Sequence, residues 1–168
     1  QIGRGESKKG GETIGSGIVM FVIVGALLTL IMVIFAKAFS GALNAPEEAF
    51  AQTVSYVRIC GAGCVVITAY NLIGSIFRGM GDSKTPLIAV GIACIFNVAG
   101  DLLFVAVFHM GSAGAALATV MAQAVSVILS LLIIRRQAIP FDFSRNDIRF
   151  RKDIIKRIFS LGAPIALQ

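Results

Sequence analysis

The stretch TIGSGIVMFVIVGALLTLIMVIFA, at positions 13–36, contains no charged side chain. Three more apolar stretches follow, at positions 53–77, 87–108 and 113–134. A helix needs about 20 residues to cross the hydrocarbon core of a bilayer, and each of the four stretches is long enough to do so. The short alternating segments that build a transmembrane β-barrel are not found in the sequence. The sequence therefore predicts an all-α, polytopic transmembrane helix bundle.

The composition agrees with this class. Hydrophobic residues make up 57% of the 168 residues and charged residues 14%, and the mean hydropathy is +0.87. Soluble domains are about one quarter charged. The 15 Lys and Arg exceed the 9 Asp and Glu, which gives a net charge of +6. We attribute this excess to loops on the cytoplasmic side of a membrane, and we expect no nucleic-acid partner.

The charged residues gather between the apolar stretches. Segments 1–12, 78–86 and 135–160 are basic, whereas segments 37–52 and 109–112 contain few cations. Loops rich in Lys and Arg stay on the cytoplasmic side of a membrane. This alternation predicts a multi-pass protein of the plasma (inner) membrane, with the three basic segments in the cytoplasm.

The C-terminal part combines charge with apolar residues. From Arg145 to Phe159, Ile and Phe alternate with Arg and Lys, which is typical of an amphipathic helix on a membrane surface. We interpret residues 135–160 as a basic linker, and LGAPIALQ, at 161–168, as the start of another transmembrane helix. The chain opens without Met and closes inside an apolar segment, so we expect it to be an internal piece of a longer membrane protein.

One apolar stretch contains an acid. FNVAGDLLF, at 96–104, includes Asp101, the only acidic residue of the four stretches, and Asn97 lies one helical turn before it. In a hairpin centred on Met110, Thr119 reaches the same depth as Asp101, about 13–14 Å below the turn. Carboxylate, amide and hydroxyl groups suit a small cation such as Na⁺ or a titrating proton. The alternative is that Asp101 only pins two helices together.

Other polar residues give weaker signals. Tyr70, Asn71 and Gln123 are candidates for lining a substrate cleft, although such side chains more often pack helices together. Three cysteines also lie in apolar stretches, and we interpret them as small core residues: Cys60, Cys64 and Cys94.

The sequence lacks the motifs of the main enzyme classes. GRGESKKGG, at 3–11, does not have the spacing of a phosphate-binding loop, so no use of ATP is expected. One buried acid is too few for an intramembrane enzyme. We therefore predict no enzymatic activity, no cofactor, and no metal beyond Na⁺ at Asp101.

Three stretches resemble a known family. SIFRGMGDSKTPL at 75–87, FNVAGDLLF, and MGSAGAALATVMAQ at 110–123 resemble the multidrug and toxic compound extrusion (MATE) transporters, and the resemblance extends over nearly the whole chain. It implies twelve helices in two six-helix lobes. This chain would then hold helices three to six and the start of the seventh, so that residues 1–134 belong to the amino-terminal lobe.

The resemblance also implies a site. One branch of the family, which includes the DNA-damage-inducible type, holds a cation in this lobe with an Asn and an Asp four residues apart on the fifth helix and a Thr on the sixth. These positions correspond to Asn97, Asp101 and Thr119. The branch also uses an Asp from the first helix, which this chain lacks.

The function implied is secondary active efflux. The family exports small organic, often cationic, compounds in exchange for Na⁺ or H⁺, by alternating access between its two lobes. The expected partners are these compounds, membrane lipid and the remainder of the same transporter chain. Two alternatives stay open: a lipid-linked oligosaccharide flippase of the same superfamily, and a membrane scaffold without transport.

Overall fold

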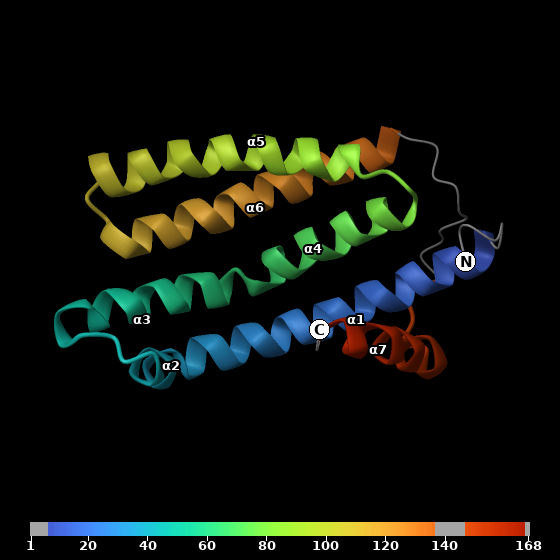
Figure 1. The fold of residues 1–168 in the computed structure, drawn as a ribbon, viewed down its shortest axis with the longest axis horizontal. Helices are drawn as coiled ribbons and strands as arrows, with labels where there is room; N and C mark the ends of the chain where they lie inside the picture. Colours follow the sequence, from blue (N-terminus) through green and yellow to red (C-terminus); the bar gives the residue numbers. More distant parts are fainter. Residues whose placement is uncertain (1–6, 137–146, 167–168) are drawn as a thin grey trace.

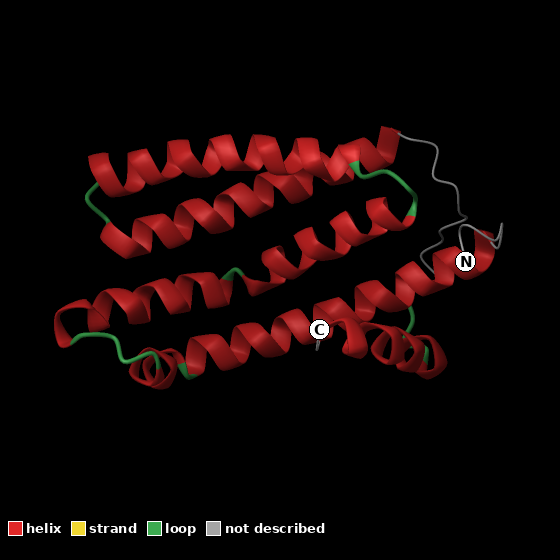
Figure 2. Ribbon diagram, in the orientation of Figure 1, coloured by secondary structure: helices red, strands yellow, loops and turns green. Residues whose placement is uncertain are grey.

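The computed structural model describes residues 7–136 and 147–166, and its elements are all helical in these two ranges. Figure 1 shows long helices lying side by side, and Figure 2 shows short loops joining them. In chain order the elements are α1 (Ser7–Ile34), α2 (Ala36–Ala42), α3 (Glu47–Ala62), α4 (Cys64–Gly79), α5 (Lys84–Asp101), the π-helical η2 (Leu102–Val107), α6 (Gly111–Arg136) and α7 (Lys152–Ala166). The predicted all-α class is confirmed.

The surface of this bundle is apolar. Leu87 and Ile95 on α5 are each 71% exposed, and many large apolar side chains of α1 and α6 also face outward. Within residues 7–136 and 147–166, three helices are long and apolar enough to cross a membrane, or four spans result if α3 and α4 count as one bent span. A surface of this kind is stable only against lipid or further transmembrane helices. The described part of the chain is therefore a multi-pass membrane bundle.

The first helix is longer than the apolar stretch. The loop predicted over 1–12 is wrong for residues 7–12, which form the first turns of α1. The hydroxyl of Thr13 donates to the carbonyl of Lys9 over 2.8 Å inside these turns. Polar residues mark where a helix leaves the apolar region, and the helix itself can continue beyond that point.

The second apolar stretch is bent. A single span was expected over 53–77, but α3 and α4 meet at Gly63 with an angle of 51°. A Cβ on Gly63 would lie 2.5 Å from Cγ2 of Val120 on α6, and one on Gly61 would lie 2.7 Å from Cβ of Met32 on α1. Because both glycines lack a Cβ, the bend lies directly against its two neighbours, as small residues allow in membranes.

The loop before α5 is built by local hydrogen bonds. Gly81 has φ of +83°, which favours glycine, and the amide of Asp82 donates to the carbonyl of Phe77 over 3.0 Å. The Asp82 carboxylate accepts from the amides of Lys84 and Thr85, each over 3.0 Å, and so caps α5. The hydrogen bonds from Thr85 lower the pKa of Asp82 below its usual value. The turn SIFRGMGDSKTPL thus fixes where α4 ends and α5 begins.

The helices α5, η2 and α6 form a tight hairpin. A Cβ on Gly100 would lie 3.0 Å from Cβ of Ala118, and one on Gly114 would lie 2.9 Å from Cβ of Phe104. The third apolar stretch was expected to be one regular helix, but its end is π-helical from Leu102 to Val107. This change of helix type begins directly after the buried acid.

The last helix packs on the start of α1. The hydroxyl of Ser16 donates to the carbonyl of Arg149 over 3.1 Å, and Arg151 forms a 2.8 Å ion pair with Glu12. A new transmembrane helix was expected from 161, but residues 161–166 continue α7 without a break. Of the linker predicted over 135–160, residues 137–146 lie outside the described part of the chain.

Candidate cation site

The hairpin brings two predicted site residues together. The side-chain amide of Asn97 on α5 donates to the hydroxyl of Thr119 on α6 over 3.3 Å. The same hydroxyl donates to the carbonyl of Ala115 over 2.9 Å. Counting from the turn near Met110 places Asp101 level with Thr119, and the contact that Thr119 makes is with Asn97, one helical turn before Asp101.

Asp101 lies one turn further along the same helix. Its atom Oδ1 is buried and has no hydrogen-bond partner among the residues that the structure describes. A buried carboxylate oxygen without a partner is energetically costly, and the cost falls when a cation or a proton binds it. One helical turn away, the amide of Asn97 and the hydroxyl of Thr119 that it contacts offer further hard oxygens, which fit Na⁺.

A tyrosine on α3 lies within electrostatic range of this acid. Tyr56 is 41% exposed, so we place it near the site and not in it. Sequence reasoning missed this neighbour, because α3 is not the hairpin partner of α5 and no turn relates the two depths. Asn97, Asp101 and Thr119 together form the candidate cation site.

Two cavities with both polar and apolar lining lie beside this site, one between α4, α5 and α6 and the other between α4 and α5. The first, the site cavity, has a volume of about 220 Å³ and is lined by Asn97, Thr119, Gln123 and Tyr70. The second, the loop cavity, has a volume of about 250 Å³ and is lined by Tyr70, Asn71 and residues of the 78–86 loop. The three weaker candidates thus line cavities next to the site.

The three weaker candidates differ in how their polar groups are used. The side-chain amide of Asn71 donates to the carbonyl of Ile67 over 2.8 Å, so it is bonded within its own helix. Oε1 of Gln123 is buried, and no described residue is its hydrogen-bond partner. Gln123 therefore has a free acceptor for water or a ligand, whereas Asn71 already has a partner.

One cysteine departs from the core role predicted for all three. Cys60 and Cys64 are partly buried, but Cys94 is exposed and lines the site cavity. The prediction is wrong for Cys94 because a cysteine in an apolar stretch can face a polar gap between helices as well as the core.

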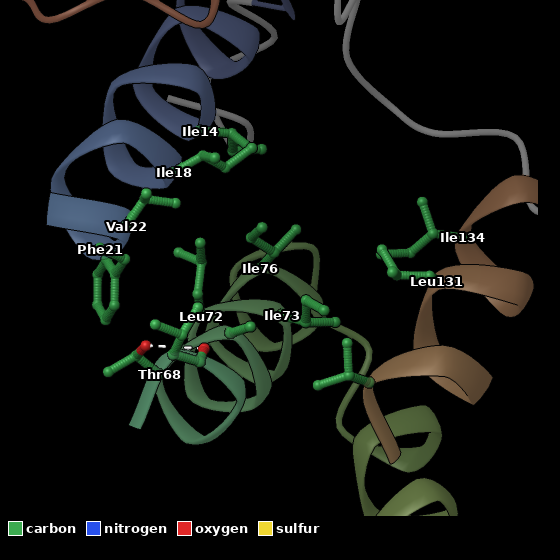
Figure 3. A pocket seen from close by; sticks show the side chains of 13 residues that line it. Ile14, Ile18, Phe21, Val22, Thr68, Leu72, Ile73, Ile76, Leu131 and Ile134 are labelled. Atoms are coloured by element: carbon green, nitrogen blue, oxygen red, sulfur yellow. Dashed lines mark hydrogen bonds between the residues drawn. The ribbon is translucent and has the colours of Figure 1, made fainter. Parts of the chain in front are cut away.

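A larger cavity of about 330 Å³ has a different character. Its lining comes from α1, α4 and α6 and is nearly all apolar, with Ile14, Phe21 and Leu131 among the residues that Figure 3 labels. The one hydroxyl in this lining, that of Thr68, donates to the carbonyl of Cys64 over 2.8 Å. This cavity therefore offers contacts to apolar groups only and does not belong to the cation site.

The fold and the site define a class of protein: a multi-pass helical membrane protein with a partly buried polar site between two of its helices. The MatE family matches residues 1–103, which is more than half of the chain. The chain belongs to this family.

Named relatives and solved structures agree. The chain is 33% identical over 127 residues to the probable multidrug resistance protein YpnP of Bacillus subtilis, covering 75% of this chain and 28% of the relative. It is 22% identical over 180 residues to the probable multidrug resistance protein NorM of Thermotoga maritima, covering 99% and 37%. The chain thus spans about a third of these relatives' length.

Two solved structures share this fold. An outward-facing multidrug resistance MATE family transporter aligns with a TM-score of 0.84 and 25% identity, covering 97% of this chain and 37% of that one. An inward-facing structure aligns with a TM-score of 0.83 and 23% identity, covering 91% and 35%. The chain therefore resembles both conformations equally well.

Proposed function

We propose that this chain is part of a secondary active multidrug exporter that exchanges its substrate for Na⁺ or H⁺. The main support for this proposal is the buried Oδ1 of Asp101. This atom has no hydrogen-bond partner among the described residues, and Asp101 lies one helical turn from the Asn97–Thr119 contact. A functional role is the usual reason for an acid inside a membrane. The names of the multidrug resistance relatives support export of small organic compounds. No cofactor and no enzymatic step is needed.

In this proposal the charge of Asp101 couples the ion to the substrate. Asn97 and Thr119 supply neutral oxygens one helical turn from the carboxylate, so that binding of the ion changes the charge of this part of the protein. Moving one charge across 100 mV is worth about 2.3 kcal/mol, enough to bias an equilibrium between two conformations. The site would then favour one orientation of the transporter when filled and the other when empty.

Alternating access would move this part as one body. The TM-scores of 0.83 to an inward-facing structure and 0.84 to an outward-facing one are nearly equal. A lobe that kept its fold while rocking against a second lobe would give this result. The flippase and scaffold alternatives have no supporting observation in the described residues.

The transport proposal is tested with the full-length transporter in proteoliposomes loaded with a fluorescent organic cation. We expect transport against the concentration gradient of the dye when a Na⁺ or proton gradient is imposed, and none with ATP alone. A sodium ionophore should abolish transport if Na⁺ is the coupling ion, and a proton ionophore should abolish it if H⁺ is. Comparing the two ionophores therefore identifies the ion. Transport that needs ATP, or none under either gradient, would contradict the proposal.

We also propose the orientation predicted by loop charge, with segments 1–12, 78–86 and 135–160 in the cytoplasm of the plasma membrane. Single cysteines placed at 5–10 and at 140–150 in the full-length transporter should react with an impermeant reagent from the cytoplasmic side. Cysteines at 44–48 should react from outside. Reaction of all three regions from one side would contradict this topology.

A further inference from the structure

The site cavity and the loop cavity share a wall. Tyr70 on α4 and Val90 on α5 line both of them. The site cavity reaches the Asn97–Thr119 contact, and the loop cavity reaches Arg78 and Ser83 at the loop between α4 and α5. The two cavities therefore follow one another along the same face of α5.

The spacing of the lining residues shows how far this face extends. From Ser83 through Val90 to Asn97, the α5 residues that line the cavities recur every three or four positions, as on one side of a helix. Ser83 and Asn97 are 14 residues apart. This separation corresponds to about 21 Å along the helix axis, or more than half of a bilayer core of about 30 Å.

Polar groups along this face lack protein partners. Ser126 on α6 is fully buried and lines the site cavity, and its hydroxyl has no hydrogen-bond partner within the described ranges. Oε1 of Gln123, one turn before Ser126, is also buried and has no hydrogen-bond partner among the described residues. Buried polar groups are paired with protein or with ordered water, and a cavity of about 220 Å³ has room for several water molecules beside these groups. These groups therefore indicate a hydrated space.

We propose that the two cavities form one hydrated path between α4, α5 and α6, along which the coupling ion moves between the candidate cation site and the side of the membrane that holds the 78–86 loop. This inference rests on the proposed function, because it assigns the ion a route to that same site. Val90 and Tyr70, which line both cavities, form its junction. Polar groups line the path on both sides of this junction.

A cation at the entrance does not close the path. The guanidinium of Arg78 donates to the hydroxyl of Ser75 over 3.0 Å, which holds it against its own helix. Arg78 is also exposed, so water surrounds part of its charge. It lines the entrance without filling it, which leaves room for a small hydrated cation or for a proton carried by water.

Cys94 provides a probe, because its side chain lines the site cavity beyond the junction. In the full-length transporter with every other cysteine removed, a permanently charged trimethylammonium methanethiosulfonate should modify Cys94 from the side of the 78–86 loop. Val90→Phe should slow this reaction at least about tenfold, since thiol exchange depends on access. Val98→Phe, the same change on the same helix at a residue that lines neither cavity, should change the rate less than about twofold.

Export is measured in the same variants. Slower labelling together with slower ion-driven export in Val90→Phe, but not in Val98→Phe, supports the path. An unchanged labelling rate in Val90→Phe, or an unreactive Cys94, overturns the path, and slow labelling with normal export overturns its role in ion movement.

If Val90→Phe does not accumulate, Ala93→Leu replaces it, because Ala93 lines the site cavity. If Asp101→Asn retains normal export, the proposed function fails, whereas the labelling result still decides whether the path exists.

Discussion

Replacing Asp101 with asparagine in the full-length transporter is expected to reduce ion-driven export at least about tenfold. Removing a charged group from a metal or proton site lowers ion affinity or activity by about this factor or more. Asparagine keeps the volume of the side chain and removes its charge. The buried Oδ1 has no hydrogen-bond partner among the described residues, so the substitution breaks no bond seen in the structure. Expression and thermal stability should therefore stay near those of the unmodified protein.

Substitutions of the neighbouring residues Asn97 and Thr119 should also weaken coupling, the first more than the second. Asn97→Ala removes the donor of the 3.3 Å hydrogen bond to Thr119 and should weaken coupling clearly. Thr119→Ala should weaken it less, because a hydroxyl is one neutral ligand among several. The measurement is the export rate as a function of Na⁺ concentration and of pH. Asp101→Asn that exports at the normal rate with normal ion dependence would make Asp101 a structural residue that only joins helices.

A second large effect is expected at the bend between α3 and α4. Gly63→Ala places a Cβ 2.5 Å from Cγ2 and 3.2 Å from Cβ of Val120, and the two helices must move apart to admit it. Overpacking of this kind destabilises a protein by about 1–3 kcal/mol. The midpoint of thermal unfolding of the full-length transporter in detergent should fall accordingly.

Gly91→Ala is the matched control for this change. Gly91 lies within α5, and a Cβ there would meet nothing within 4 Å. Since alanine favours a helix by up to about 1 kcal/mol over glycine, this variant should be as stable as the unmodified protein or more so. Equal midpoints for Gly63→Ala and Gly91→Ala would show that the contact with Val120 does not limit the approach of α6.

Hydropathy and turn chemistry predict most of this fold. The apolar stretches are long enough to identify the transmembrane helices, and the glycines of segment 78–86 mark the turn between α4 and α5. The bend at Gly63 and the π-helix after Asp101 are not predictable in this way, because a glycine or an apolar run also occurs in a straight helix.

The candidate site was predictable where a turn relates its residues. Asp101 and Thr119 lie on the two arms of one hairpin, and counting from the turn near Met110 puts them at one depth. The contact that Thr119 makes is with Asn97, one helical turn before Asp101. Tyr56 lies on α3, which is separated from α5 by a bend and a loop, and residue counting cannot place it near Asp101. Cys94 was misassigned for a related reason, since only the gap between α4 and α5 makes its surroundings polar.

The hairpin of α5, η2 and α6 also bears on biosynthesis. A single helix carrying Asp101 would enter lipid at a cost of about 2.5–3.5 kcal/mol for the acid alone. Its amide neighbour Asn97 finds Thr119 only 22 positions later in the chain, so the two arms can leave the translocon already joined. Insertion as a pair shields these polar groups from lipid before more distant helices arrive. The residues of the site therefore also govern how this part of the protein enters the membrane.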